Sequence, residues 1–408
     1  MRILQLCKKF PYPLKDGESI AVTYLSRALV NLGCEVTLLS MNTSKHHFDV
    51  KDIPAEYNHY KEIHTVEVDN RVKPHKAFLN LFSHKSYHIT RFVSEEYRKY
   101  LISLLQNNDY DIVQLETLYL TPYIDVIKEN SNALVTMRSH NIEFEIWERI
   151  VKNTNFIPKK LYLNHLTKKL KKYELDKLND YDYLVAISDR DLSKFKKLGY
   201  KNGAMSTPIG LQLDNYNQVG KQQSKVSICF IGALDWIPNF EGLTWFLESV
   251  WPIVIDHKPD VNFHIAGRNT PESLLSLSMN NVHVHGEIED AVEFIAEHDI
   301  MVVPLFSGSG MRVKILEGMA LGRAIVSTTL GKEGIGARDG HEIVVADNAN
   351  EFAHKILNLI EDRVHCKEIG KNATQFVKSF YDHNNIAAQL LEKYEVLLSS
   401  GYKIKGNS

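Results

Sequence analysis

The sequence is poor in cysteine and has no long apolar run. The four cysteines, at positions 7, 34, 229 and 366, are scattered and form no CxxC or Cys/His spacing. This pattern argues against a disulfide framework and a structural zinc site and favours reduced, buried thiols. Apolar runs such as residues 300–306 are far shorter than the roughly 20 residues that span a bilayer. Because Lys8 and Lys9 end the first apolar stretch, we also expect no signal peptide and a cytoplasmic location.

An excess of charge of one sign is also missing. The chain has 48 basic and 50 acidic side chains, giving a formal net charge of −2, which argues against a dedicated nucleic-acid-binding protein. Apolar residues make up 44% and charged residues 24% of the 408 positions, close to the average of soluble globular proteins. At roughly 150 residues per domain, this length predicts two or three domains.

The first half of the chain opens with a strand, a helix and a second strand. Residues 2–7 form a short apolar run, residues 20–32 repeat apolar side chains at helical spacing up to Gly33, and residues 35–41 form the next apolar run. This βαβ order implies parallel strands with a right-handed crossover. Further strands are predicted at residues 112–115, 134–138 and 183–186.

The same pattern restarts at residue 226. Strands are predicted at residues 226–231, 261–266, 282–285, 300–305, 324–327 and 343–345, with a helix at 240–255. We therefore predict an α/β protein with two doubly wound, Rossmann-like domains in tandem, at residues 1–212 and 213–384, and the polar stretch 212–225 as the linker. Because ligands of such sheets bind beyond the carboxyl ends of the strands, two facing sheets would place the site in the cleft between them.

The most informative segment follows the predicted strand at 300–305. It contains the turn Gly308-Ser309-Gly310, then Arg312, Lys314 and Glu317 on a short helix that ends at Gly322. Backbone amides of a glycine turn and the start of a helix favour an anion, to which Arg312 and Lys314 add charge. This arrangement suits a diphosphate, with Glu317 as an acceptor for the hydroxyls of a ribose.

A simpler interpretation of this segment is an ordinary strand–helix turn carrying a surface Lys314–Glu317 pair, with Arg312 in solvent. Two better-known phosphate motifs are excluded. GxxxxGK[ST] is absent, and Val313 stands where the Rossmann fingerprint has its third glycine.

The string from residue 307 to 334, centred on LEGMALGRAIVST, resembles the donor-site region of family 4 glycosyltransferases, the glycosyl transferases group 1. Further strings that resemble this family lie at residues 230–239, 264–267 and 285–286, and in the opening residues 11–17 and 32–36. The resemblance spans nearly the whole chain, most closely residues 226–346. It implies the GT-B fold, two Rossmann-like domains that face an interdomain cleft.

The resemblance also implies a function. It implies a retaining enzyme that moves a sugar from a nucleotide-diphosphate sugar, held by the second domain, to a glycan or lipid-linked acceptor held by the first. It implies no cofactor and no catalytic metal, and a last helix, residues 385–408, that returns to the first domain. The donor-binding residues that it implies are Gly17, Gly232, Gly267, His285, Gly308, Ser309, Gly310, Glu317 and Glu333.

This sequence departs from the family pattern at three places. Ser309 stands where the family has the first of two glutamates, eight positions before Glu317. The loop at residues 233–241 lacks the usual basic pair, and we expect Arg312 and Lys314 to replace it in catalysis. In the first domain, Gly17 is followed by Glu18 instead of a second glycine.

His140 follows the predicted strand at 134–138 and matches the family histidine that faces the donor sugar, which makes it a candidate catalytic residue. A solvated or helix-capping histidine is the alternative. The neighbouring Arg138 is a weaker candidate, for which a role in the site and a structural pairing with Glu143 or Glu145 are equally well supported.

Two basic stretches with interleaved aromatic residues, at positions 71–92 and 159–172, make the inner membrane surface a candidate partner, with a solvated helix face as the alternative. Two other functions remain open: a nucleotide-sugar 2-epimerase, which would need a pair of acid/base carboxylates, and a noncatalytic nucleotide-sugar-binding subunit. The resemblance does not identify the sugar, the base or the acceptor.

Overall fold

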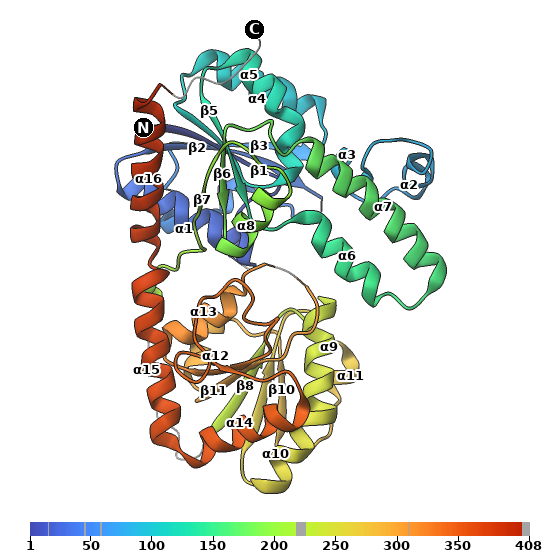
Figure 1. The fold of residues 1–408 in the computed structure, drawn as a ribbon, viewed down its shortest axis with the longest axis vertical. Coiled ribbons are helices and arrows are strands. Elements are labelled where there is room, and N and C mark those ends of the chain that lie inside the picture. Colours follow the sequence, from blue (N-terminus) through green and yellow to red (C-terminus); the bar gives the residue numbers. More distant parts are fainter. Residues whose placement is uncertain (15, 45, 58, 218–225, 309, 402–408) are drawn as a thin grey trace. The chain divides into compact units, whose positions relative to one another are not determined.

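The computed structural model describes residues 1–408 except 15, 45, 58, 218–225, 309 and 402–408. The chain divides into two compact units, which are described separately (Figure 1). Unit 1 contains Met1–Gly210 and the segment from His383 onwards, and unit 2 contains Leu211–Asp382. The boundaries lie within two residues of those expected from the sequence.

Unit 1 is built on a parallel sheet that, in the described residues, has seven strands in the order β3-β2-β1-β4-β5-β6-β7. Its strands are β1 (Arg2–Cys7), β2 (Glu35–Thr43), β3 (Glu62–Val68), β4 (Ile112–Leu115), β5 (Leu134–Ser139), β6 (Tyr183–Ala186) and β7 (Gly203–Ser206). The strands at both edges, β3 and β7, were not predicted. β3 alternates polar and apolar residues, and β7 reads GAMS, so neither has the apolar run typical of a buried parallel strand.

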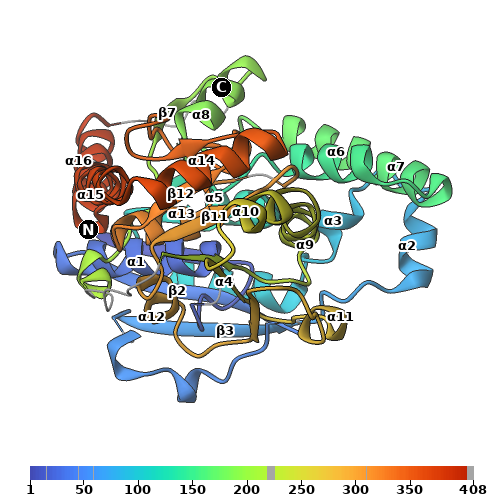
Figure 2. The same cartoon turned by 90° about the horizontal axis from the view of Figure 1, so that it is seen from below.

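Helices cover both faces of this sheet (Figure 1). They are α1 (Gly17–Asn31), α2 (Pro74–Asn80), α3 (Tyr87–Thr90), α4 (Glu95–Asn107), α5 (Ile124–Asn130), α6 (Glu143–Asn153), α7 (Ile157–Asp176), α8 (Asp189–Lys197) and α16 (His383–Ser399). In Figures 1 and 2, α2 and the antiparallel pair α6 and α7 lie to one side of the sheet of unit 1.

The last helix belongs to unit 1, as the resemblance implies. Its buried residues Ala387 and Leu390 pack with Val22 and Leu25 of α1 in one hydrophobic cluster. The buried Tyr394 hydroxyl donates to Oε1 of Gln114 on β4 at 2.9 Å. Burying these side chains removes apolar surface from water at about 25 cal/mol per Å², which explains why the chain returns here after completing unit 2.

Unit 2 contains a second parallel sheet, with six strands among the described residues in the order β10-β9-β8-β11-β12-β13. Its strands are β8 (Ser227–Ile231), β9 (Asn262–Ala266), β10 (Val282–Gly286), β11 (Ile300–Val303), β12 (Ala324–Ser327) and β13 (Val344–Val345). The apolar runs of the sequence predict all six, because both faces of a parallel sheet are covered by helices.

The helices of unit 2 are α9 (Ile237–Trp245), α10 (Trp251–His257), α11 (Glu272–Leu275), α12 (Ala291–Ala296), α13 (Val313–Ala320), α14 (Ala349–Glu361) and α15 (Arg363–Phe380). The single helix predicted at 240–255 is interrupted by a π-helical turn, η5 (Phe246–Val250), which precedes Pro252. A proline inside a helix lacks the N–H that the regular hydrogen-bond pattern needs, so the pattern shifts at this point.

The first residues of the predicted linker, 212–225, belong to unit 2. Leu211 opens unit 2 and its N–H donates to the carbonyl of Tyr381 at 2.7 Å. A 3₁₀ turn, η4 (Leu213–Tyr216), follows, and Tyr216 is buried. The rest of the predicted linker, residues 218–225, lies outside the described residues.

Candidate functional site

Three loops of unit 2 meet at the carboxyl edge of its sheet, after β8, β9 and β10. The Gly267 N–H donates to the carbonyl of Gly286 at 2.8 Å, and the Gly232 N–H donates to that of Ala266 at 3.2 Å. A Cβ atom on Gly267 would lie 2.0 Å from the carbonyl oxygen of Gly232. Gly267 therefore lets two backbones approach each other, whereas a Cβ on Gly232 would lie 2.7 Å from Nδ2 of Asn239.

The glycine turn predicted from the sequence follows β11 and precedes α13. Gly308 and Gly310 both have positive φ, at +92° and +82°, which strongly favours glycine; Ser309 lies outside the described residues. The Arg312 side chain is 6% exposed and its Nη1 donates to the carbonyl of Gly310 at 2.5 Å. The guanidinium lies 5.6 Å from the ring centre of Trp236. Arg312 is therefore held against the turn and is not directed into solvent.

Lys314 lies at the start of α13, also away from solvent. Its Nζ donates to the carbonyl of Ile231 at 3.0 Å and to Oδ1 of Asn239 at 2.9 Å. Burial, together with the charge of Arg312, lowers the pKa of Lys314 to about 7, while Glu317 acts in the opposite direction. The Lys314–Glu317 surface pair of the simpler interpretation is not present, because Lys314 binds the end of β8 and the first turn of α9.

Glu317 lies on α13, and the hydroxyl of Tyr216 donates to its Oε1 at 3.0 Å. Burial raises the pKa of Glu317, and the Tyr216 hydrogen bond and the charge of Lys314 oppose that rise. Close packing fixes the helix itself, since a Cβ on Gly318 would lie 2.7 Å from Ile325 and 2.9 Å from the sulfur of Met301. Glu317 is thus a carboxylate held by one donor on a rigid helix.

Two further predicted residues lie in unit 2. Glu333 is half-buried in the turn after β12, next to Gly334, whose φ is +85°. His285 lies on the edge strand β10, and its Nε2 is 3.0 Å from Nδ1 of His264 on β9. The imidazole of His285 therefore binds His264 on the neighbouring strand. A ligand at the end of β10 would meet the backbone atoms of this position.

In unit 1, His140 follows β5 and is 6% exposed. Its Nε2 lies 3.0 Å from Oε2 of Glu116, a fully buried carboxylate at the end of the neighbouring strand β4. Burial opposes ionisation of Glu116, but the charge of Arg138 and the hydrogen bond of His140 outweigh it and lower the pKa of Glu116 to about 2. An ionised Glu116 accepts a hydrogen bond from Nε2–H, which leaves Nδ1 of a neutral imidazole as a lone-pair acceptor.

Glu116 has three further donors. Gln5 and Gln114 donate to its Oε1 at 2.6 Å and 2.5 Å, and Arg138 Nη1 donates to its Oε2 at 3.2 Å. The alternative in which Arg138 pairs with Glu143 or Glu145 is therefore wrong, because the guanidinium binds Glu116 on the neighbouring strand.

Gly17 lies at the first position of α1, at the carboxyl edge of the sheet of unit 1. Asp16 caps this helix by accepting from the N–H of Ser19 at 3.0 Å, and Lys9 binds Asp16 at 2.6 Å. The adjacent Glu18 binds Lys8 at 3.1 Å. Gly17 thus begins a helix whose first turn is surrounded by ion pairs.

The structure adds four residues that sequence reasoning missed: Tyr216, Trp236, Asn239 and Glu116. Trp236 and Asn239 lie within the string 230–239 that carries the resemblance, so a signal was present. Tyr216 contacts Glu317 from 101 positions away, and Glu116 ends a strand without a local motif. Among the described residues, no group of three or more His, Cys, Asp or Glu side chains has a geometry that could hold a metal ion.

Comparison with known proteins gives one matching family model, glycosyl transferases group 1, over residues 225–362. A 44.6 kDa protein of the cps region of Klebsiella pneumoniae is 26% identical over 309 residues, which are 72% of this chain and 77% of that protein. Phosphatidyl-myo-inositol mannosyltransferase of Mycobacterium leprae is 25% identical over 201 residues, covering 48% of this chain and about half (51%) of the mannosyltransferase.

Solved structures with the same fold cover nearly the whole chain. Sucrose-phosphate synthase from Thermosynechococcus elongatus superposes with a TM-score of 0.73 at 15% identity, covering 98% of this chain and all (100%) of that one. The Anabaena protein HepE in complex with UDP has a TM-score of 0.67 at 15% identity, covering 97% and 100%. In the described part of the chain, no helix is long and apolar enough to cross a membrane. Residues 225–362 therefore match the glycosyl transferases group 1 family, and the chain has the two-domain GT-B fold.

Proposed function

We propose that the chain is a retaining, metal-independent glycosyltransferase that moves a sugar from a nucleotide-diphosphate sugar to a glycan or lipid-linked acceptor. The observation that carries this proposal is the segment of unit 2 from the glycine turn into α13, where two cations, Arg312 and Lys314, lie near the carboxylate of Glu317. The cations can bind a diphosphate, and the carboxylate can accept hydrogen bonds from the hydroxyls of a ribose. The three side chains lie within about one and a half turns at the start of α13.

Arg312 and Lys314 have different tasks in this proposal. Breaking the sugar–phosphate bond increases the negative charge on the departing diphosphate, which amides, cations and the start of a helix stabilise. The guanidinium offers a planar fork, while the ammonium is a point charge. Because the pKa of Lys314 is about 7, an approaching diphosphate would favour its charged form.

In unit 1, His140 would act on the donor sugar. Glu116 fixes its Nε2–H, so Nδ1 is the nitrogen left to accept a hydrogen bond from a sugar hydroxyl or to stabilise developing positive charge. Glu317, held by Tyr216, would accept hydrogen bonds from the ribose of the donor. Gly232, Gly267, His285, Gly308, Ser309, Gly310 and Glu333 would complete the donor site in unit 2, and Gly17 is the further donor-binding candidate in unit 1.

The relatives support the direction of this proposal. HepE is solved with UDP and with UDP-glucose, one relative is a mannosyltransferase acting on phosphatidyl-myo-inositol, and another is encoded in a cps region. We infer a role in polysaccharide or lipopolysaccharide biosynthesis, in the cytoplasm or at the inner face of the membrane.

A surface for the membrane contact lies at the turn between α6 and α7. Phe156, Ile157 and Leu161 are each about two-thirds exposed, at 67%, 69% and 66%. The exposed Lys159 lies among them. Other lysines of the predicted basic stretch are engaged elsewhere, since Lys171 binds Glu148 at 2.8 Å. Apolar side chains with adjacent cations suit an anionic lipid surface.

A panel of sugar nucleotides in a thermal-shift assay tests the donor proposal. A ligand at about 100 times its dissociation constant adds about 2.7 kcal/mol to the stability of the folded state. Glu317→Ala, which removes charge-assisted hydrogen bonds worth about 1.5–3 kcal/mol each, should weaken the best ligand at least tenfold. Glu361→Ala, on the same unit and ion-paired with Lys258, is the control. An unchanged dissociation constant in Glu317→Ala would contradict the ribose assignment.

Two functional alternatives are tested with the same protein. An epimerase would interconvert the free sugar nucleotide without an acceptor, and a noncatalytic subunit would bind it without hydrolysis or transfer. The proposed enzyme transfers only when an acceptor is present, apart from slow hydrolysis, and does so in excess chelator. Loss of turnover that magnesium or manganese restores would contradict metal independence.

A further inference from the structure

A cavity of about 530 Å³ opens in unit 1 beside the end of the edge strand β3. Its walls come from the end of β3, α2, α3 and the start of α4, and they include both charged and apolar side chains. The residues that matter here are Asp69, Arg71, Lys73, Asn80, Tyr87 and Arg91. Nothing in the donor site uses this cavity.

Most charges of the cavity wall are paired. Asp69 accepts from Nε and Nη2 of Arg71 at 2.8 and 3.1 Å and lies 3.0 Å from Nζ of Lys73. The other carboxylate of the wall, Glu67, accepts from Asn42 at 2.7 Å and lies 3.5 Å from His47. The wall residues therefore contain three cations and two carboxylates, with Glu67 bound away from the cations.

Arg91 is the cation left over. In the described residues no carboxylate lies within 4 Å of its guanidinium, whose Nη1 donates to the carbonyl of Asn70 at 3.3 Å. The group lies 5.7 Å from the ring centre of Tyr87 and 5.8 Å from that of Phe92. Two aromatic rings hold the side chain in place, so the cavity keeps a fixed positive charge without a matching anion.

Among the described residues, two polar atoms of the wall lack hydrogen-bond partners. Asn80 is 8% exposed, and its Oδ1 has no partner, although its Nδ2 donates to the carbonyl of Lys85 at 3.0 Å. The Nε–H of Arg91 is also buried without a partner. Buried polar groups in folded proteins are nearly always satisfied. A ligand with a hydroxyl for Asn80 and an anion for Arg91, admitted by a small movement of these side chains, would satisfy both.

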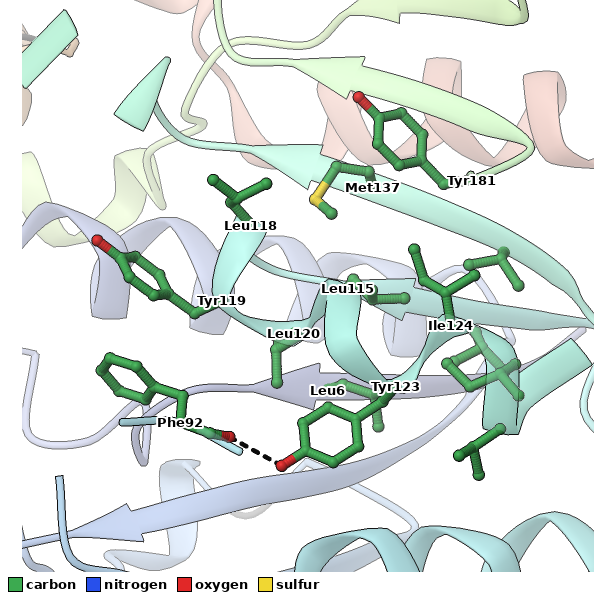
Figure 3. Packing of buried hydrophobic residues seen from close by; sticks show 14 of the residues in the cluster. Leu6, Phe92, Leu115, Leu118, Tyr119, Leu120, Tyr123, Ile124, Met137 and Tyr181 are labelled. Atoms are coloured by element: carbon green, nitrogen blue, oxygen red, sulfur yellow. Dashed lines mark hydrogen bonds between the residues drawn. The ribbon is translucent and has the colours of Figure 1, made fainter. Parts of the chain in front are cut away.

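The cavity lies one aromatic layer away from the groups around His140. The ring beneath Arg91, Phe92, lies 4.8 Å from that of Tyr119 (Figure 3). The hydroxyl of Tyr119 donates to Oε2 of Glu143 at 2.9 Å, and Glu143 is the first residue of α6, three positions after His140. Phe92, Tyr119 and Glu143 thus connect the wall of the cavity to the segment that contains His140. A saccharide chain bound at His140 could therefore also contact this cavity.

We propose that this cavity binds an anionic saccharide, a sugar ring that carries a carboxylate or a phosphate, as part of the acceptor. This inference rests on the proposed function, because it assigns the ligand to the acceptor of the transfer. Arg91 forms a bidentate contact with the anion, Asn80 accepts from a ring hydroxyl, and Tyr87 packs against the ring.

Titration of the full chain with three small probes tests the inference. Glucuronic acid and glucose 1-phosphate present the two anions on the same ring, and glucose presents none. We expect at least one anionic probe to bind and glucose to bind at least tenfold more weakly, and the better anionic probe identifies the source of the charge. Arg91→Gln should weaken that probe about tenfold or more, the change expected for one charge-assisted hydrogen bond. Lys99→Gln, an exposed cation on α4 outside the cavity, should leave binding unchanged.

The outcomes separate this inference from the proposed function because UDP is titrated into the same samples. Binding of UDP without binding of either anionic sugar would overturn the cavity assignment alone. Binding of an anionic sugar that Arg91→Gln leaves unchanged, or equal binding of glucose, would also overturn it. Failure of the whole panel of nucleotides would overturn the proposed function and leave the cavity as a saccharide site. If Arg91→Gln does not fold, Lys73→Gln at the exposed rim should weaken the anionic probe in the same direction, by a smaller factor.

Discussion

Replacing Glu116 by Gln should destabilise unit 1 strongly, although the two side chains have nearly the same shape. Glu116 is fully buried and receives hydrogen bonds from two glutamines, Arg138 and His140. The pKa falls from the ordinary value of 4.5 to about 2, which corresponds to about 3 kcal/mol of stability. The amide also leaves the buried guanidinium of Arg138 without a carboxylate, a loss of the order of 3–5 kcal/mol. The two figures describe the loss of the same charge and are not added. We therefore expect the free energy of unfolding to fall by about 3–5 kcal/mol in total.

Hydrogen exchange measures this loss in the unit concerned. The most protected amides of β4 and β5 should exchange faster in Glu116→Gln by the factor that corresponds to the lost free energy, while those of β11 in unit 2 should not change. Glu96→Gln removes an exposed carboxylate of α4 and should stay within about 0.5 kcal/mol of the native protein. In the native protein this contribution is complete above pH 4.5 and is lost as the pH falls towards 2. A loss below about 1 kcal/mol in Glu116→Gln would refute the assignment of an ionised, buried carboxylate.

Four further predictions concern the site and its surroundings. His140→Ala should lower kcat by about 10²-fold or more with little change in donor affinity; a change confined to the acceptor KM would place His140 in the acceptor site. Arg312→Lys should retain some donor binding and lose much turnover, and the double variant Arg312→Ala with Lys314→Ala should abolish transfer; a folded double variant with more than about a tenth of the native kcat would contradict this. Because the pKa of Lys314 is about 7, donor affinity should fall as the pH rises from 7 to 9, and should do so less in Lys314→Met; equal slopes would show that Lys314 does not meet the diphosphate. Burial and three neighbouring histidines lower the pKa of His264 to about 3, so the stability of unit 2 should be complete above pH 6.5 and decline below it, with a shallower decline in His264→Phe if the cluster is responsible.

The sequence predicts the central strands well and the edges of unit 1 poorly. β1, β4, β6 and β12 have the predicted bounds because their residues are mostly apolar and, apart from Arg2, buried. β3 alternates polar and apolar residues and β7 is the short string Gly-Ala-Met-Ser, so both lack that signal. The interruption of the helix at η5 follows from Pro252. The apolar spacing of residues 240–255 predicted one continuous helix and did not take this proline into account.

The candidate site divides in the same way. Local strings predict the glycine turn, Arg312, Lys314 and Glu317, because these residues act within one loop and one helix. The partners that set their charge come from distant positions: Asn239 for Lys314, Tyr216 for Glu317 and Glu116 for His140. Such pairs depend on which strands lie next to each other, which spacing along the chain does not specify.

The most direct test of the central claim is the anomeric configuration of the sugar that the enzyme releases or transfers. Proton NMR at early times, before free sugar mutarotates, reads this configuration from the anomeric resonance of an α-linked nucleotide-sugar donor. Retaining transfer predicts the α-anomer in the first product, and loss of that product in the double variant of Arg312 and Lys314. Appearance of the β-anomer first would contradict the account.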